Sequence, residues 1–298
     1  MSFLLSPKVD FVFKRIFGNE KHPNILISFL NAVINPTDRI KSVQILNTDI
    51  DKEHIDDKYS RLDVKALTDK GEHINIEIQV RNEYNMIERS LYYWSKMFES
   101  QIIKRDNYSK LARTVCINIL DFEYLDGDSF HSIYKLKEVT TNKELTDKME
   151  LHFIELPKLE DNKISDMLEA WLLFIKEPTS EMLYNSPNTA EEIKQAKEEL
   201  IVLSADSKDR LIYDRRKESM LEKNSLLYSA IQAEKEGIKK GMREGMKEGM
   251  KEGKKEGERQ AKIELAKNAI NNGLDNNLIQ SLTGLSVSEI KELRNKTR

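Results

Sequence analysis

Residues 61–80 read RLDVKALTDKGEHINIEIQV, and this stretch decides how the rest of the chain is organised. Two runs of alternating side chains flank a short polar turn that contains Gly71, which is typical of a β-hairpin. If Gly71 adopts the left-handed conformation in a three-residue turn, the register of the two strands is fixed. That register predicts that Asp63 lies opposite Glu77.

Strand alternation sorts the side chains of this hairpin onto two faces. The predicted apolar face consists of Leu62, Val64, Ala66, Ile74, Ile76, Ile78 and Val80. The predicted polar face consists of Asp63, Lys65, Asn75, Glu77 and Gln79. Two carboxylates therefore converge on a polar face whose reverse side is packed on a core.

The carboxylates of Asp63 and Glu77, with the backbone carbonyl of Ile78, form a cluster of hard oxygen ligands. Such a cluster suits Mg²⁺ or another divalent cation. A cation held there can activate water and neutralise charge on a scissile phosphate, which predicts phosphodiester hydrolysis. The same residue types also occur on the exposed polar face of an edge hairpin, so the spacing alone leaves both interpretations open.

The composition of the chain bounds its class. It has 298 residues, of which 39% are hydrophobic and 33% charged, with a formal net charge of -3. These values predict one domain of ordinary size with helical appendages, and they disfavour a protein that coats nucleic acid through its overall charge. The lone cysteine, Cys116, excludes an internal disulfide. No signal peptide or membrane segment is recognised, so a cytoplasmic protein is expected.

Hydrophobic periodicity predicts the order of the remaining elements. Helices are expected at residues 6–17, 23–34 and 86–104, and strands at 40–46, 112–120, 132–138 and 150–156. The apolar stripe of the third helix is predicted to hold Ile87, Leu91, Trp94, Met97 and Phe98. The run 112–120 is apolar throughout, as in a central strand. This order predicts an α/β sandwich, followed by helices alone after residue 163.

The segment 237–257 repeats a four-residue unit that begins with glycine. Each glycine costs roughly 1 kcal/mol in a helix relative to alanine, so the segment is expected to be either a solvated linker or a helix that packs its glycine face against another helix. The second alternative predicts a homo-oligomer. Beyond it, LIQSLTGLSVSEI has the layout of a helix-turn-helix, and also of any two-helix hairpin.

Four segments are predicted from these changes in pattern. Residues 1–160 are predicted to form the domain that contains the hairpin, and residues 161–233 a helical appendage. Residues 234–260 are the glycine, lysine and glutamate repeat, as helix or linker, and 261–298 a small helical hairpin that resembles a helix-turn-helix.

Five separated blocks resemble a known family. They are PKVDFVFKRIFG, LISFLNAVI, RLDVKALTDKGEHINIEIQV, RSLYYWSKMFESQI and MELHFIELPKL, in this order between residues 6 and 159. Together these blocks resemble the Rpn family of recombination-promoting nucleases, also described as PD-(D/E)xK nuclease family transposases. The resemblance implies an α/β, restriction-endonuclease-like core, in which a mixed sheet is flanked by helices, with an α-helical C-terminal extension.

The resemblance also implies site residues. Asp63 fills the aspartate position of the motif, and Glu77 with Gln79 fills the (D/E)xK position. Gln79 stands where lysine is usual, and an amide can orient water but supplies no positive charge. Lys65 is the first candidate for the missing cation, with Lys14 and Arg89 behind it.

Other residues are expected to support this site. Asp10 lies in a matching block and is predicted to reach the metal or orient Lys14, although a carboxylate at a helix start is also favoured by the helix dipole. Arg81 and Arg89 are predicted to contact DNA phosphates.

Two functions follow from the sequence. The first is a Mg²⁺-dependent DNA endonuclease in recombination or mobile-element biology. The alternative is a catalytically inactive DNA-binding or assembly protein that keeps the nuclease fold.

Overall fold

The computed structural model describes residues 4–46, 64–160, 163–187 and 189–296. The chain divides into two compact units, Met1–Glu222 and Lys223–Arg298. The first unit contains the β-sheet and the helices that cover it, and the second contains the C-terminal helices. The four segments expected from the sequence stay a prediction.

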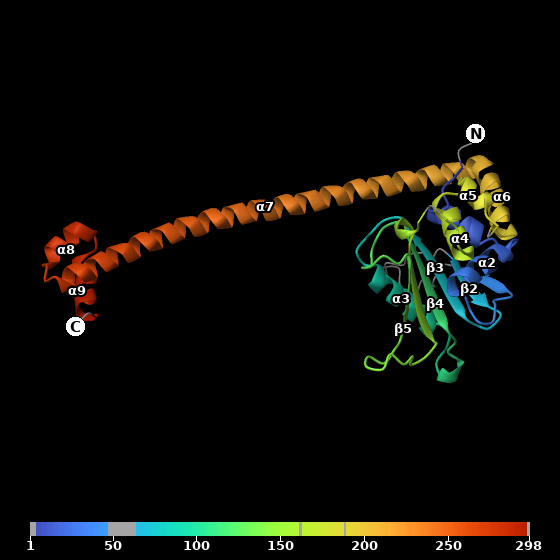
Figure 1. The fold of residues 1–298 in the computed structure, drawn as a ribbon, viewed down its shortest axis with the longest axis horizontal. Coiled ribbons are helices and arrows are strands. Elements are labelled where there is room, and N and C mark those ends of the chain that lie inside the picture. Colours follow the sequence, from blue (N-terminus) through green and yellow to red (C-terminus); the bar gives the residue numbers. More distant parts are fainter. Residues whose placement is uncertain (1–3, 47–63, 161–162, 188, 297–298) are drawn as a thin grey trace. The chain divides into compact units, whose positions relative to one another are not determined.

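A six-stranded mixed sheet organises the described part of the first unit, with the order β1-β2-β3-β4-β6-β5 (Figure 1). Strands β1 to β3 pair antiparallel, β4 is parallel to β3 and to β6, and β5 is antiparallel to β6. The strands are β1 Val43–Leu46, β2 Val64–Thr68, β3 His73–Gln79, β4 Thr114–Leu120, β5 His131–Lys135 and β6 Met149–Glu155. The predicted mixed sheet with flanking helices is confirmed.

The predicted hairpin is formed by β2 and β3. Val64 pairs with Ile76 and Lys65 with Asn75, which is the predicted register. Gly71 closes the turn with a φ of 76°, and its N–H donates to the carbonyl of Thr68 at 2.9 Å. The left-handed conformation predicted for Gly71 is confirmed. Asp63, the predicted partner of Glu77, lies outside the described residues.

Gly71→Ala is expected to lower the free energy of unfolding by about 1–2 kcal/mol, because an L side chain is strained in the left-handed region. Apart from Gly71 and its two chain neighbours, no heavy atom of the described residues lies within 4 Å of the position that its Cβ would take, so the cost is conformational and not steric. Urea denaturation measures it. Gly245→Ala is the control with the opposite sign, since Gly245 lies inside a helix, has an equally open Cβ position, and gains helix propensity.

Helices cover both faces of the sheet. Four of them lie on one side of the sheet and share its core, α1 (Asp10–Phe17), α2 (Pro23–Ile34), α4 (Met167–Lys176) and α6 (Glu191–Ala205), whereas α3 (Met86–Glu99) packs on the other face (Figure 1). The short helices η1 (Tyr108–Lys110), η2 (Leu156–Lys158) and α5 (Glu181–Asn185) lie in the connections. The helix predicted at 23–34 is confirmed in full. The first helix begins at Asp10, later than predicted, because a turn from Ser6 to Val9 precedes it.

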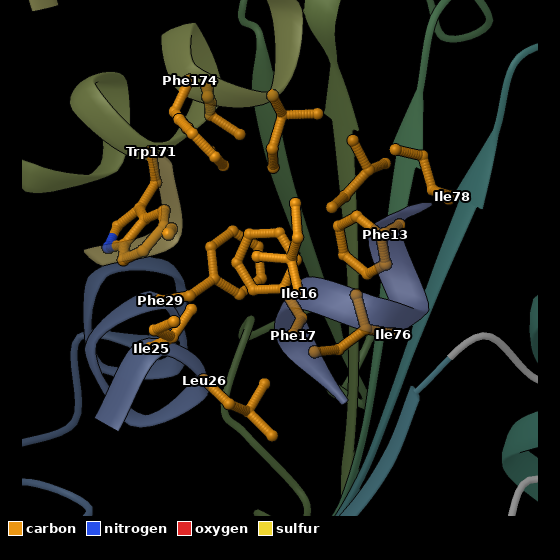
Figure 2. Close-up of a cluster of buried hydrophobic side chains, with 14 of the residues drawn as sticks. Phe13, Ile16, Phe17, Ile25, Leu26, Phe29, Ile76, Ile78, Trp171 and Phe174 are labelled. Carbon is orange, nitrogen blue, oxygen red and sulfur yellow. The ribbon is translucent and has the colours of Figure 1, made fainter. Parts of the chain in front are cut away.

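Aromatic side chains from three helices fill the core against the sheet (Figure 2). The rings of Phe13 and Phe17 are stacked at 4.4 Å, and Trp171 lies 5.5 Å from Phe17 and 6.2 Å from Phe29. Ile76 of β3 points into the same cluster. Helices that follow residue 160 therefore share one core with the sheet. The apolar face predicted for the hairpin is buried at Val64, Ala66, Ile74, Ile76 and Ile78.

The predicted apolar stripe of α3 is partly wrong: Met97 is buried and Trp94 is packed against the same core, but two other members are exposed. Ile87 and Leu91 are 44% and 42% exposed, and the buried side chains are Met86, Ser90, Tyr93 and Met97. The strand face that the helix covers includes the buried polar residues Asn75, Glu77 and Asn118 beside apolar ones. Ser90 donates to Oδ1 of Asn118 on β4 at 2.7 Å, a contact that apolar periodicity does not register. The helix also ends at Glu99, earlier than predicted.

Strand β4 is buried at all seven positions, which confirms the predicted central strand. Cys116 lies within it and is a buried free cysteine. Burial raises the pKa of its thiol, as expected for a core residue and not for a nucleophile.

The C-terminal unit is helical. Helix α7 (Ser207–Asn271) continues through the whole glycine repeat, so the repeat is a helix and not an irregular linker. It is followed by α8 (Asn276–Thr283) and α9 (Val287–Lys296). Gly284 ends α8 with a φ of 70°. The small core of this unit is formed by Ala266, Ala269, Ile270, Ile279, Leu285 and Ile290. No helix in the described ranges has the length and apolarity needed to cross a membrane.

Candidate active site

Glu77 is a carboxylate inside the protein. It lies near the carboxyl end of β3, opposite Asn118 of the parallel strand β4, and its side chain is 2% exposed. Alternation places it on the face that α3 covers, together with Asn75, which is 1% exposed. The polar face of the hairpin is therefore buried under a helix at this point. The alternative of an exposed polar surface is excluded for Glu77.

Arg89 of α3 is the partner of Glu77. Its Nη2 donates to Oε1 of Glu77 and forms a salt bridge with it. The same guanidinium lies 5.4 Å from the ring centroid of Tyr93, and its Nη1 is 3.9 Å from Oε2 of Glu83. The other oxygen of Glu77, Oε2, is buried and has no hydrogen-bond partner among the described residues. One oxygen of this carboxylate is thus satisfied and the other is open.

Burial dominates the electrostatics of Glu77. Burial raises its pKa to about 7, against the opposing effect of the Arg89 charge and hydrogen bond, and the charge of Asp10 adds to the rise. Burial alone would lower the pKa of Arg89, but the Glu77 carboxylate raises it above its ordinary value. Burial therefore disfavours the charged form of Glu77 more than Arg89 stabilises it.

The other predicted residues of β2 and β3 have different surroundings. The side chain of Ile78 lies in the core, 3% exposed, while Gln79 is half-buried on the same face as Glu77. The N–H of Asp121 donates to the carbonyl of Gln79 at 2.9 Å, which joins the ends of β3 and β4. Lys65 pairs with Asn75, and its charge lowers the pKa of His73 after the larger effect of burial.

Asp10 begins α1 and is close enough to Glu77 for its charge to act on that carboxyl. Its Oδ1 accepts from the N–H of Phe11 at 2.7 Å, and its Oδ2 is 3.4 Å from Arg216. Lys14 lies one turn further along the same helix. Arg81 follows β3, and its Nε is buried without a hydrogen-bond partner in the described part of the chain. The roles predicted for these residues stay predictions.

Two arrangements were not predicted from the sequence. The first is the pairing of Glu77 with Arg89, which was assigned only to a DNA phosphate or to the missing cation. A signal for it exists, because Arg89 lies three residues after Met86 and four before Tyr93, on the stripe that is buried in α3. The second arrangement is a polar network on the opposite face of the sheet.

That network joins two histidines to a buried carboxylate. Nε2 of His152 is 2.7 Å from Oε1 of Glu150, and Nδ1 of His152 is 2.8 Å from Nε2 of His131. Arg113 donates to Glu150 at 2.7 Å and to Glu72 at 2.9 Å. Burial alone would raise the pKa of Glu150, but the hydrogen bonds from His152 and Arg113 lower it to about 2. The network ties β6 to β5 and to the start of β4.

The network predicts a loss of stability in acid. Burial, reinforced by His152, lowers the pKa of His131 to about 4, although the charges of Asp166 and Glu150 oppose this. An unfolded histidine binds its proton near pH 6.5, so the unfolded chain gains protons first and stability falls as the pH drops from about 6.5 to 4. Glu150, whose folded pKa is the lower one, continues the loss from about 4.5 to 2.

His131→Gln is expected to remove the upper part of this pH dependence, on the order of 1–2 kcal/mol after allowance for partial exposure. Urea denaturation at pH 7, 5.5 and 4.5 measures it. His22→Gln is the matched control, because His22 is a histidine of the same unit whose side chain contacts Gln195 and Glu199 and not the network. An unchanged slope in His131→Gln between pH 6.5 and 4.5 would contradict the assignment.

The sheet and its flanking helices define a mixed α/β protein with a buried carboxylate on the polar face of the hairpin. A family model described as PD-(D/E)XK nuclease family transposase matches residues 7–230. This is more than half of the chain, which therefore belongs to that family. A second family model, described as Rpn/YhgA-like nuclease family, C-terminal HTH domain, matches residues 259–295. No curated protein and no solved structure matches the chain significantly.

These matches support a nuclease or transposase role, and the C-terminal match supports DNA binding, since the helix-turn-helix is a DNA-binding motif. The family resemblance expected from five blocks of sequence is confirmed.

One oxygen of Glu77 fits a hard divalent cation. The open Oε2 of a carboxylate that is 2% exposed is an oxygen ligand without a partner among the described residues. No group of three or more His, Cys, Asp and Glu side chains in the described ranges could hold a metal by itself. Asp63, the second predicted ligand, lies outside those ranges. The fit therefore rests on Glu77.

Proposed function

We propose that this protein is a divalent-metal-dependent DNA endonuclease, with Asp63 and Glu77 as the metal ligands and Mg²⁺ as the cation. The observation that carries the proposal is the buried carboxylate of Glu77, whose second oxygen is open, in a chain of a nuclease family. A buried carboxylate with an unsatisfied oxygen is costly to the fold, and such costs are typical of functional sites.

In this proposal each residue of the chain has one task. Glu77, Asp63 and the carbonyl of Ile78 hold the cation, which supplies an activated water and neutralises charge on the phosphate when bound. The amide of Gln79 orients the attacking water, and Lys65 adds positive charge at the phosphate. Asp10 supports the site from the start of α1. Lys14, Arg81 and Arg89 contact the DNA backbone.

Plasmid cleavage tests this proposal. The wild type should convert supercoiled plasmid to nicked or linear forms in Mg²⁺ and not in a chelator, and Asp63→Asn should lose this activity. Asp69→Asn is the matched control, because it changes an aspartate in the turn of the same hairpin and keeps an oxygen acceptor for the N–H of Lys41. Equal cutting by the wild type and Asp63→Asn would remove Asp63 from the mechanism.

A second candidate function is DNA binding or assembly without cleavage. The glutamine at position 79, where lysine is usual, and the match of residues 259–295 to a helix-turn-helix domain favour it. In this case truncation after Ala233 should abolish DNA binding. Glu77→Gln should bind DNA like the wild type, and neither the wild type nor Glu77→Gln should cut it. Gel-shift titration of the full and truncated chains distinguishes the two candidates.

The glycine repeat of α7 is part of the proposal as a contact between two copies of the chain. Beyond the adjacent backbone of the helix itself, no heavy atom of the described residues lies within 4 Å of the Cβ position at any of its glycines, and Met242, Met246 and Met250 are more than 70% exposed along the same helix. A methionine of one copy could fill a glycine gap of the other. Sedimentation of the full chain and of a chain ending at Ala233 tests this, and a monomer in both cases would contradict it.

We place the protein in the cytoplasm and its activity in recombination or mobile-element biology. The single buried cysteine suits a reducing compartment, and the family description includes transposases.

A further inference from the structure

A metal ion bound to Glu77 would disturb the salt bridge between Glu77 and Arg89. Its guanidinium occupies Oε1 of the carboxylate that the proposed function assigns to the cation. A divalent cation on Oε2 would bring two like charges to the same carboxylate, and like charges repel strongly in a buried site. Arg89 and the metal are therefore competitors for Glu77.

The surroundings of Arg89 allow a second position of its side chain, nearer to solvent. Its side chain is 20% exposed, so its site lies at the border between the buried face and solvent. Glu83, whose side chain is 41% exposed, lies 3.9 Å from Nη1 on the solvent side, and the ring of Tyr93 supports the guanidinium from α3. Its Nε is buried without a partner in the described residues. The guanidinium is thus held by contacts at its tip and can turn outward while Tyr93 keeps it near the site.

A DNA phosphate is the partner that such a released guanidinium fits best. Arginine presents parallel N–H donors that match two oxygens of a phosphate, and it keeps its charge at any pH of interest. A phosphate bound at a metal on Glu77 would lie beside the arginine that the metal displaces.

We infer that Arg89 exchanges partners: it neutralises Glu77 while the metal site is empty, and it contacts a DNA phosphate once a divalent cation takes the carboxylate. This inference rests on the proposed function, since it needs a metal on Glu77. Metal binding then strengthens DNA binding, and by reciprocity DNA strengthens metal binding. When the cation is bound, the released Arg89 also supplies the positive charge that Gln79 does not.

The salt dependence of DNA binding tests the exchange. A short duplex is titrated with the full chain at several salt concentrations, in Ca²⁺ and in a chelator, and a gel confirms that the duplex is intact. One phosphate contact changes the slope of log K against log salt by about 0.9. Arg89→Gln should reduce the slope by about this amount in Ca²⁺ and leave it unchanged in the chelator.

Two variants of the same helix serve as controls. Arg89→Lys keeps a positive charge and should restore most of the slope in Ca²⁺. Lys96→Gln removes a charge from an exposed position of α3, 40% exposed, and should show no difference between Ca²⁺ and the chelator. A slope that Arg89→Gln lowers equally with and without Ca²⁺, or not at all, would overturn the exchange.

A measurement on the wild type covers the case in which Arg89→Gln does not fold. The side-chain Nε–H resonance of Arg89 in ¹⁵N-arginine-labelled protein, assigned with Arg89→Lys, should shift when Ca²⁺ is added without DNA and shift again with DNA. A resonance that Ca²⁺ leaves in place would overturn the inference.

Calorimetric titration of Ca²⁺ without DNA separates this inference from the proposed function. Glu77→Gln should lose Ca²⁺ binding and Arg89→Lys should keep it. If Glu77→Gln binds Ca²⁺ like the wild type, the metal site itself is misassigned. If Glu77→Gln loses Ca²⁺ while Arg89→Gln keeps the wild-type salt slope, the metal site stands and only the exchange of Arg89 is wrong.

Discussion

Glu77→Gln is expected to slow plasmid cleavage in Mg²⁺ by about 10²- to 10⁴-fold, the loss that corresponds to several kcal/mol of metal-derived stabilisation of the transition state. The substitution keeps the size of the side chain and an oxygen that can accept from Arg89, but it removes the negative charge that would bind a cation. The effect should therefore fall on metal binding and catalysis and not on the packing of α3 against the sheet. The rate of loss of supercoiled plasmid measures it.

The matched control is Glu83→Gln. Glu83 is a second carboxylate beside Arg89, 3.9 Å from its Nη1, but it is 41% exposed and its charge is screened by solvent. Cleavage by Glu83→Gln should stay within about threefold of the wild type. Circular dichroism should show that both variants keep the wild-type helix content. If Glu77→Gln cleaves plasmid at the wild-type rate, the Glu77 carboxylate is a structural partner of Arg89 and not a metal ligand.

The hairpin shows what sequence patterns can predict. Alternation of apolar residues and a glycine in the turn determine the register of Val64 with Ile76, because a shift by one residue would turn every side chain to the wrong face. The buried face and the conformation of Gly71 followed from the same rule. The position of Glu77 on the polar face was predictable for this reason.

The surroundings of that polar face were not predictable in the same way. Whether a polar strand face meets solvent or a helix depends on where a distant segment packs, and α3 presents Ser90 and Arg89 to it as well as apolar side chains. Apolar periodicity ignores such residues, so it assigned Ile87 and Leu91 to the core. The contact between His131 and His152 was not predicted for a related reason. The two side chains meet through the antiparallel pairing of β5 with β6.

The continuous helix of the glycine repeat was not predictable from local propensity alone. Local propensity predicts a weak helix, at roughly 1 kcal/mol per glycine relative to alanine, yet α7 runs through all six glycines of the segment 237–257. Packing against a second copy, as proposed, would offset that cost.

Trp171→Ala is expected to lower the free energy of unfolding of the first unit by about 3–5 kcal/mol, which is a large part of the stability of an ordinary domain. The indole is fully buried among Phe17, Phe29 and Phe174, and its Nε1 donates to Oγ of Ser28 at 3.2 Å. Truncation therefore leaves a cavity and removes a hydrogen bond from α2. Tyr108→Ala is the control, because Tyr108 is an aromatic residue of the same unit that is 79% exposed, and it should change stability by less than about 0.5 kcal/mol.

The fluorescence of Trp94, the other tryptophan, allows the same experiment to test whether the helices after residue 160 unfold together with the sheet. Trp94 packs beside the opposite face of the sheet, where its Nε1 donates to the carbonyl of Thr114 at 3.1 Å. If α4 belongs to one cooperative domain with the sheet, Trp171→Ala should shift the urea midpoint reported by Trp94 as far as the midpoint reported by circular dichroism. If the helices after residue 160 unfold on their own, as a separate appendage would, the Trp94 transition should stay at its wild-type midpoint. We expect the first result, because the aromatic cluster joins Trp171 to both helices that cover the sheet from the start of the chain.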